Sequence, residues 1–207
     1  LSPDIMPIKV DKEYLKTPII PFDAAEKAHI PVWITEISDV TPLDTSIQDG
    51  LKWAVTFHNY LTKANVNAII WWGGAMPTSN NESLIILNKN RKDYTLSKRY
   101  DILGNYSRYI SEGSTRIQVT QPKNKDLLVS AYKKNDKYIL VAINLSEKTI
   151  STNIRLDGAN IKGALKQFIT NKDNRWNKTN IVPVSNKYYN LTIPQFSIVT
   201  LVGKVHL

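Results

Sequence analysis

Two apolar runs in the N-terminal part of the chain predict buried β-strands. Residues 30–34 and 68–72 are nearly continuous in apolar side chains, which is the pattern of parallel strands that are covered on both faces. Glu36 lies two positions beyond the first run, and the second run ends at a pair of glycines. Parallel strands are joined by helical crossovers, so we expect a helix between the two runs.

The predicted helices are marked by apolar residues at a spacing of three or four. After residues 44–46, which offer N-caps, apolar side chains recur at helical spacing, and Asp49 follows Ser46 at the spacing of a capping box. Another such set, within residues 102–110, predicts a helix after a polar loop. The order is strand, helix, strand, loop, helix, which indicates consecutive units of a barrel or an open α/β sheet.

The C-terminal part has a different pattern, with short segments rich in β-branched and aromatic residues between polar turns. Seven such segments at short spacing favour a β-sandwich. They are residues 117–120, 127–132, 138–144, 149–156, 164–170, 188–193 and 197–202. No cluster of titratable residues is found there, so we expect no catalysis in this part. A carbohydrate-binding face could be formed by four aromatic residues, which are Trp176, Tyr188, Tyr189 and Phe196. We favour instead a role for these residues in the core or at an interface.

Charge separates the same two parts. The net charge of the 207 residues is +9, but residues 1–112 carry 12 basic and 13 acidic side chains, whereas residues 113–207 carry 15 and 5. The lysines of the second part are scattered through turns without a nucleic-acid-binding signature, so we interpret them as solvated surface and expect no nucleic-acid partner. No apolar run approaches the ~20 residues that cross a bilayer, and we expect a soluble protein without membrane association.

Candidate chemistry is concentrated at the ends of the two predicted strands. The C-terminal ends of parallel strands carry the active sites of barrel and open-sheet enzymes, and Glu36 is placed there. Trp71 and Trp72 end the next strand, and a carboxylate beside an indole is typical of sugar sites. One of the two tryptophans is expected to belong to the core. Asp39 and Asp44 could supply a second carboxylate, but both read more simply as caps.

Metal and thiol chemistry are not indicated. The chain has no cysteine and only three scattered histidines, so we expect no metal site and no cofactor.

The ordered set of motifs resembles the C-terminal half of glycoside hydrolase family 30 enzymes, most closely the xylanase branches. The resemblance spans roughly residues 15–203 and continues through Leu128-Val129-Ser130-Ala131-Tyr132 and Ile193-Pro194-Gln195-Phe196-Ser197. The motifs of the N-terminal part are Val32-Trp33-Ile34-Thr35-Glu36, His58-Asn59, Ala68-Ile69-Ile70-Trp71-Trp72, Leu96-Ser97-Lys98-Arg99-Tyr100 and Leu103-Gly104-Asn105-Tyr106-Ser107-Arg108-Tyr109-Ile110.

This resemblance implies a fold, a location and a catalytic residue. Members are (β/α)8 barrels with a side β-sandwich, so residues 1–112 would be the C-terminal part of a catalytic barrel, with strands seven and eight, and residues 113–207 the sandwich. They cleave β-glycosidic bonds with retention, and Glu36 matches their nucleophile. The implied location is extracellular, as a secreted protein.

The resemblance also shows what this chain lacks. A barrel needs about 250 residues, and the family's acid/base glutamate lies on the fourth strand in an Asn-Glu-Pro context that does not occur here. We therefore expect a complementary N-terminal polypeptide that carries the remaining strands and the acid/base glutamate.

The expected substrate is β-1,4-xylan, cleaved without dependence on glucuronic acid. The glucuronate-requiring branch resembles this sequence but carries a tyrosine where Ser38 stands and an arginine pair where Gly73 and Gly74 begin the loop. Ser38, Trp71 and Trp72 are accordingly the predicted substrate-binding residues. Two alternatives remain open: a non-catalytic carbohydrate-binding fragment, or a family 30 enzyme that acts on another β-linked glycan.

Overall fold

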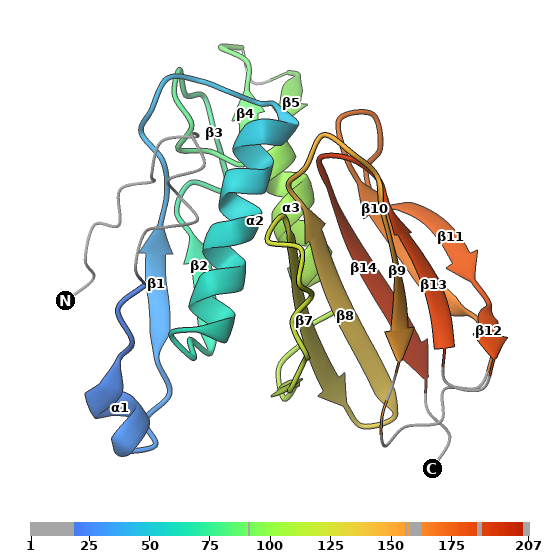
Figure 1. The fold of residues 1–207 in the computed structure, drawn as a ribbon. Coiled ribbons are helices and arrows are strands. Elements are labelled where there is room, and N and C mark those ends of the chain that lie inside the picture. Colours follow the sequence, from blue (N-terminus) through green and yellow to red (C-terminus); the bar gives the residue numbers. More distant parts are fainter. Residues whose placement is uncertain (1–18, 91, 156, 158–162, 186–187, 205–207) are drawn as a thin grey trace. The chain divides into compact units, whose positions relative to one another are not determined.

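The structure, a computed structural model, describes residues 19–90, 92–155, 157, 163–185 and 188–204 (Figure 1). The chain forms two compact units, Leu1–Tyr100 and Asp101–Leu207. Parts of the predicted regions lie outside the described residues. They include residues 1–18 of the first predicted domain, where the family resemblance begins, residue 156 at the end of the strand predicted at 149–156, and residues 205–207 of the second predicted domain. None of the described helices is long and apolar enough to cross a membrane.

A parallel pair of strands forms the centre of the first unit. Strand β1 (Trp33–Ile37) pairs in parallel with β2 (Ala68–Trp71), and helix α2 (Ile47–Thr62) joins them (Figure 1). The parallel pairing agrees with the prediction from the two apolar runs. Strand β1 starts later than the run at residues 30–34, and Ile30 is exposed. Pairing begins only at Trp33, which faces Ala68 in the register.

Helix α2 begins where its cap residues predict, although the capping box is only half formed. Ser46 is the N-cap, and its Oγ accepts a hydrogen bond from the backbone N–H of Asp49 at 3.4 Å. The backbone N–H of Ser46 donates instead to Oδ1 of Asp44 at 2.8 Å. The carboxylate of Asp49 does not return to Ser46, because it pairs with two buried cations, Lys52 and Arg99.

The segment predicted as a polar loop after β2 contains a small sheet. Its strands are β3 (Ala75–Met76), β4 (Ile85–Leu87) and β5 (Tyr94–Leu96), in the order β3-β4-β5. Strands of two or three residues are too short to show a period of two, which is why the sequence pattern missed them. Helix α3 (Lys98–Ser107) follows β5 and continues into the second unit, and it ends before Tyr109. A further short helix, α1 (Asp23–Lys27), precedes β1.

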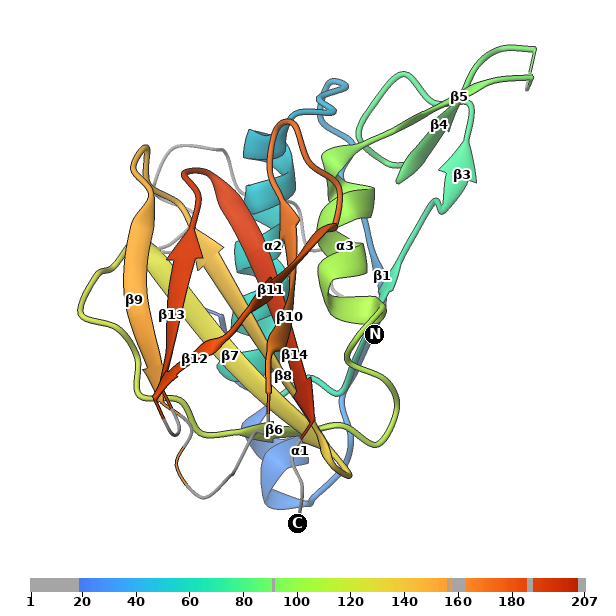
Figure 2. The ribbon, with the colours of Figure 1, turned by 90° about the vertical axis from the view of Figure 1, so that its right-hand side faces the viewer.

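The second unit contains two antiparallel sheets in its described residues (Figure 2). The larger has the order β11-β10-β14-β8-β7-β6, and the smaller has the order β12-β13-β9. The nine strands of these two sheets are β6 (Thr115–Ile117), β7 (Leu127–Lys134), β8 (Lys137–Asn144), β9 (Ile150–Arg155), β10 (Leu165–Thr170), β11 (Asn177–Ile181), β12 (Pro183–Ser185), β13 (Tyr188–Ile193) and β14 (Ser197–Lys204). Strands β11 and β12 were not predicted from the sequence.

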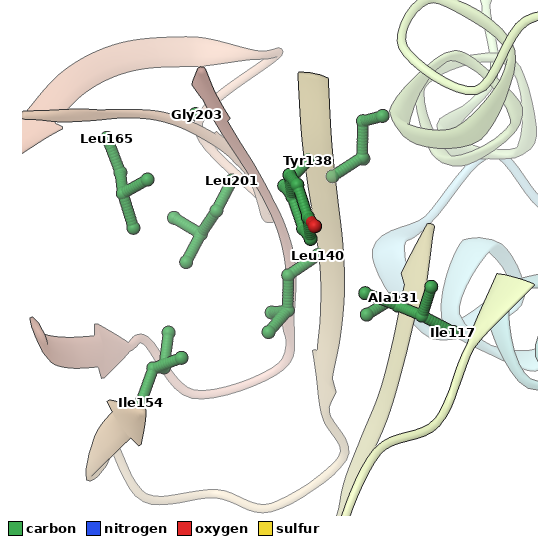
Figure 3. Close-up of a pocket in the computed structure, with 9 residues that line it drawn as sticks. Ile117, Ala131, Tyr138, Leu140, Ile154, Leu165, Leu201 and Gly203 are labelled. Carbon is green, nitrogen blue, oxygen red and sulfur yellow. The ribbon is translucent and has the colours of Figure 1, made fainter. Parts of the chain in front are cut away.

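A continuous apolar core lies between these two sheets. Alternate residues of the larger sheet, such as Ala142 and Leu201, pack with Leu191 and Ile193 of β13. Figure 3 shows a small pocket in this region, lined almost wholly by apolar side chains that include Leu140 and Leu201. Burial of the apolar core stabilises the unit by roughly 25 cal/mol per Å² of apolar surface. The pocket itself has few polar groups that could orient a polar ligand.

The end of α3 joins the same unit through polar and aromatic contacts. Nδ2 of Asn105 donates to Oγ1 of Thr200 at 3.1 Å, and Oδ1 of Asn105 accepts from Oγ1 of Thr170 at 2.6 Å. The ring of Trp176 lies directly against Gly104, and its Nε1 donates to the carbonyl oxygen of Asp101 at 2.8 Å. These contacts connect α3 to strands β10 and β14 and to the turn before β11.

Candidate functional site

Glu36 lies within β1, near its C-terminal end, and is exposed. The residues that pack toward the interior are Ile34 and Ile37, and the register with β2 is irregular between them. Thr35 and Glu36, inside this irregularity, are both exposed, whereas regular alternation would bury one of them. Bulges of this kind re-aim side chains next to active sites, and here the irregularity leaves the Glu36 carboxylate open to solvent.

The two consecutive tryptophans at the end of β2 have opposite environments. Trp71 is only 9% exposed, and its ring meets that of Trp53 edge to face at 4.5 Å. Trp72 is 50% exposed, and its backbone N–H donates to the carbonyl oxygen of Ile37 at 3.0 Å. Trp72 therefore lies at the same end of the strand pair as Glu36. The expectation that one tryptophan belongs to the core applies to Trp71, which leaves Trp72 as the available ring.

Glu82, in the loop after β3, contacts both tryptophans. Its backbone carbonyl oxygen accepts a hydrogen bond from Nε1 of Trp71 at 2.9 Å, and its Oε1 accepts one from Nε1 of Trp72 at 3.0 Å. Gly73, with φ +81°, permits this approach, because a Cβ there would lie 2.7 Å from the Glu82 carbonyl oxygen. Glu82 was not predicted from the sequence, since a single carboxylate in a polar loop carries no periodic signal.

Directly after β1, the half-buried Ser38 is followed by the fully buried Asp39. Oδ1 of Asp39 accepts from the backbone N–H of Thr41 at 2.8 Å, and Oδ2 accepts from Nζ of Lys52 at 2.7 Å. Burial acts to raise the pKa of Asp39, but the hydrogen bonds from Lys52 and Thr41 outweigh it and hold the pKa below its ordinary value. Asp39 is thus a local anchor of the loop and not a helix cap, because the N-cap of α2 is Ser46.

A buried chain of charges extends from Asp39 through α2 to the first turn of α3. Lys52 bridges Asp39 to Oδ1 of Asp49 at 3.1 Å, and Asp49 also pairs with Arg99. The Arg99 guanidinium donates to the carbonyl oxygens of Asp44, at 2.6 Å, and of Ser83, at 3.2 Å. Arg99 therefore ties the loop after β1 to the loop after β3, and Lys52 ties the loop after β1 to α2. This ion-pair chain was not predicted from the sequence, because its members come from separate segments.

One face of the β1–β2 pair is apolar and open. Trp33 is 60% exposed, Ile70 48% and Trp72 50%. Among the described residues, β1 and β2 pair only with each other. A two-stranded parallel sheet with exposed rings is unusual, since parallel strands are normally covered on both faces. Within the described residues, this face therefore lacks the cover that parallel strands normally have.

The described residues contain no group of three or more His, Asp or Glu side chains that could hold a metal ion.

Two of the aromatic candidates of the C-terminal part, Trp176 and Tyr189, are engaged within their own unit. Trp176 packs on Gly104 and carries the Arg108 guanidinium 4.4 Å from its ring centroid. Tyr189 is 1% exposed, and its hydroxyl donates to the carbonyl oxygen of Gly163 at 3.1 Å. Tyr188 remains 40% exposed. Trp176 and Tyr189 thus fit the interpretation as interface and core aromatics.

The chain is similar in sequence to curated glucuronoxylanases. The chain is 26% identical over 180 residues to the glucuronoxylanase XynC of Bacillus subtilis strain 168, a match that covers 83% of this chain and 39% of that protein. No family model matches the chain. The chain spans about two fifths of the length of the curated relatives it matches.

Solved structures show the same likeness in the fold. The glycoside hydrolase family 30 subfamily 8 xylanase Xyn30A of Clostridium acetobutylicum superposes with a TM-score of 0.77 and 23% identity, over 91% of this chain and 46% of that one. A family 30 endoxylanase of Clostridium papyrosolvens C71 gives 0.75 and 24%, over 89% and 45%. The resemblance to xylanases of glycoside hydrolase family 30 is confirmed.

Proposed function

We propose that this chain carries the nucleophile of a retaining glycoside hydrolase that cleaves β-1,4-xylan. The observation that carries the proposal is Glu36 itself. It is an exposed carboxylate at the C-terminal end of a parallel strand, at the same end as Trp72, which directly follows the neighbouring strand. The likeness to family 30 xylanases supports the same reaction class. Residues 1–112 would be the C-terminal part of a (β/α)8 barrel and residues 113–207 its side β-sandwich.

In the proposed reaction, Glu36 attacks the anomeric carbon of a xylose unit and forms a covalent glycosyl ester. A second carboxylic acid protonates the leaving oxygen and then activates the water that hydrolyses the ester. The two carboxyl groups of a retaining enzyme are ~5–5.5 Å apart. Asp39 cannot serve as the partner, because its carboxylate is buried and bonded to Lys52 and Thr41.

The acid/base glutamate and the remaining barrel strands are proposed to come from a complementary N-terminal polypeptide. The open face formed by Trp33, Ile70 and Trp72 supports this proposal, as does the partial coverage of the relatives. Further parallel strands would cover this face and pair with the outer edges of β1 and β2. Without them, the chain is expected to associate nonspecifically.

The proposed substrate is xylan whose cleavage does not depend on glucuronic acid side chains. The relatives in Bacillus subtilis are named glucuronoxylanases, but the loop after Trp72 opens with Gly73 and Gly74, where the glucuronate-requiring branch is expected to carry arginines. An anionic substituent is normally held by a bidentate arginine, which glycine cannot replace. Ser38 and Trp72 are the proposed substrate contacts. Since xylan is a polymer outside the cell, we propose an extracellular location.

The test is substitution of Glu36 by Gln in the complete protein. Release of reducing ends from linear xylan should fall by several orders of magnitude while the unfolding transition is unchanged, and a fluoroxyloside inhibitor should label a peptide that contains Glu36. Glu112→Gln, at an exposed position, is the matched control. Wild-type turnover in the Glu36 variant would eliminate the proposal. Oligosaccharide binding without hydrolysis by the wild type would favour a binding protein instead.

Substrate choice is tested by comparing products from glucuronoxylan and from undecorated xylan. We expect both polymers to be cleaved. Activity confined to glucuronoxylan, with product length set by the glucuronate positions, would show that another residue recognises the acidic substituent. Activity on another β-linked glycan alone would replace xylan as the substrate.

A further inference from the structure

The ring of Trp72 is only partly packed, because half of the side chain is open to solvent. Its neighbour Trp71 is held by Trp53 and Phe57, whereas half of the Trp72 surface is open to solvent. An exposed indole on a strand end samples several rotamers unless a directional bond restrains it. The bond that the structure provides is the one from Nε1 of Trp72 to Oε1 of Glu82, at 3.0 Å.

Glu82 can act as a restraint because its own backbone is fixed. Its carbonyl oxygen accepts the Nε1–H of the buried Trp71 at 2.9 Å, and its N–H donates to Oδ1 of Asn80 at 3.0 Å. The carbonyl also lies so close to Gly73 that a Cβ there would be 2.7 Å away. The side chain therefore extends from an anchored position. A hydrogen bond to a carboxylate is stronger than one between neutral groups.

We infer that Glu82 is a positioning residue that fixes the plane of Trp72 as a platform for a neutral sugar ring. The inference deepens the proposed function and rests on it for the sugar, but the restraint on the indole does not depend on any activity. Sugar stacking needs the indole face presented in one orientation. Ordering the ring before binding removes an entropic cost that the ligand would otherwise have to offset.

The first measurement follows the indole N–H of Trp72 by NMR in the ¹⁵N-labelled complete protein, to which this chain contributes five tryptophans. The resonance that disappears in Trp72→Phe identifies it. In Glu82→Ala, we expect this resonance to shift and its exchange with water to accelerate about tenfold, as for the loss of one hydrogen bond. Glu82→Gln, which keeps an acceptor oxygen, should retain most of the protection. An unchanged resonance and exchange rate in Glu82→Ala would overturn the inference.

The second measurement is a double-mutant cycle on xylotetraose binding. Glu82→Ala should weaken binding about threefold to tenfold when Trp72 is present, the size expected for one lost hydrogen bond, and should have no effect in the Trp72→Phe background, where no N–H is available. Equal weakening in both backgrounds would assign Glu82 a merely structural role and would also overturn the inference. Glu82→Gln serves as the folded reference if Glu82→Ala is unstable.

The two measurements separate this inference from the proposed function. If the indole responds to Glu82→Ala and the wild-type protein binds no xylotetraose, the restraint on Trp72 is supported and the proposed substrate is wrong. If xylotetraose binds but the indole does not respond, the proposed function survives and the positioning role is rejected.

Discussion

Nζ of Lys52 lies 2.7 Å from Oδ2 of Asp39, and both side chains are almost completely buried. The pair joins the middle of α2 to the residue that stands three positions after Glu36. A buried ion pair is costly to break on one side only, because the remaining charge is left without compensation. This relationship makes the end of β1 a rigid point of the first unit.

Lys52→Met tests how strongly this pair holds the strand end. We expect the free energy of unfolding to fall by about 3–5 kcal/mol, because the Asp39 carboxylate remains buried without its cation. Urea denaturation measures the effect. Lys63→Met, at the exposed C-cap of the same helix, is the matched control and should cost far less. A loss in Lys52→Met no larger than that of the control would show that the pair is energetically unimportant.

The same pair predicts a pH dependence of stability. The pKa of folded Asp39 lies below its ordinary value of 3.8, so the unfolded state binds more protons in the window just below that value. The stability contributed by ionised Asp39 is fully present above pH 3.8 and is lost as the pH falls through the lowered pKa.

Asp39→Asn removes this titration. We expect the difference in unfolding free energy between wild type and variant to be largest near neutral pH and to shrink in acid. Denaturation curves at a series of pH values measure it, with Asp23→Asn at an exposed position as the control. A difference that stays constant through the acid range would contradict the lowered pKa.

The two adjacent tryptophans are expected to respond differently to truncation. Trp71→Ala removes a buried ring and should cost about 3–5 kcal/mol of unfolding free energy. Trp72→Ala removes a half-exposed ring and should cost much less, while lowering kcat/KM on xylan in the complete protein. Each variant is the other's control, and equal destabilisation by both would contradict the assignment of Trp71 to the core and Trp72 to the substrate.

Gly104 is expected to be required by Trp176 within the second unit. A Cβ at this position would lie 2.2 Å from the ring, so Gly104→Ala should destabilise by about 1–3 kcal/mol through overpacking. This cost opposes the gain of about 1 kcal/mol that alanine normally brings to a helix interior.

Thermal unfolding of the single and double variants isolates the contact. In a Trp176→Ala background the clash is absent, so Gly104→Ala should become neutral or stabilising there. Ser107→Ala, at an exposed position of the same helix, controls for helix propensity. The same loss with and without the Trp176 ring would contradict the predicted clash.

Local pattern was sufficient to predict the elements whose burial repeats along the chain. The two apolar runs predicted a parallel pair, and the spacing after Ser46 predicted α2, because each depends on contacts between neighbours in sequence or on one continuous apolar face. The bounds of β1 differed, since pairing with Ala68 rather than hydrophobicity decides where the strand begins. The small sheet β3-β4-β5 was missed because its strands are too short to show a pattern.

The sequence by itself determined which residue types could perform sugar chemistry and in what order they occur, because the Glu36 and tryptophan positions are set by the strand pattern and by the family resemblance. Only the tertiary structure decided their environments. Regular alternation does not reveal that both Thr35 and Glu36 are exposed, nor does it separate the buried Trp71 from the open Trp72. The partners Glu82 and Lys52 come from other segments, and a hydrogen bond between distant segments leaves no periodic trace in either one. Such contacts arise when packing brings the segments together, which is the physical reason that they had to be read from the folded chain.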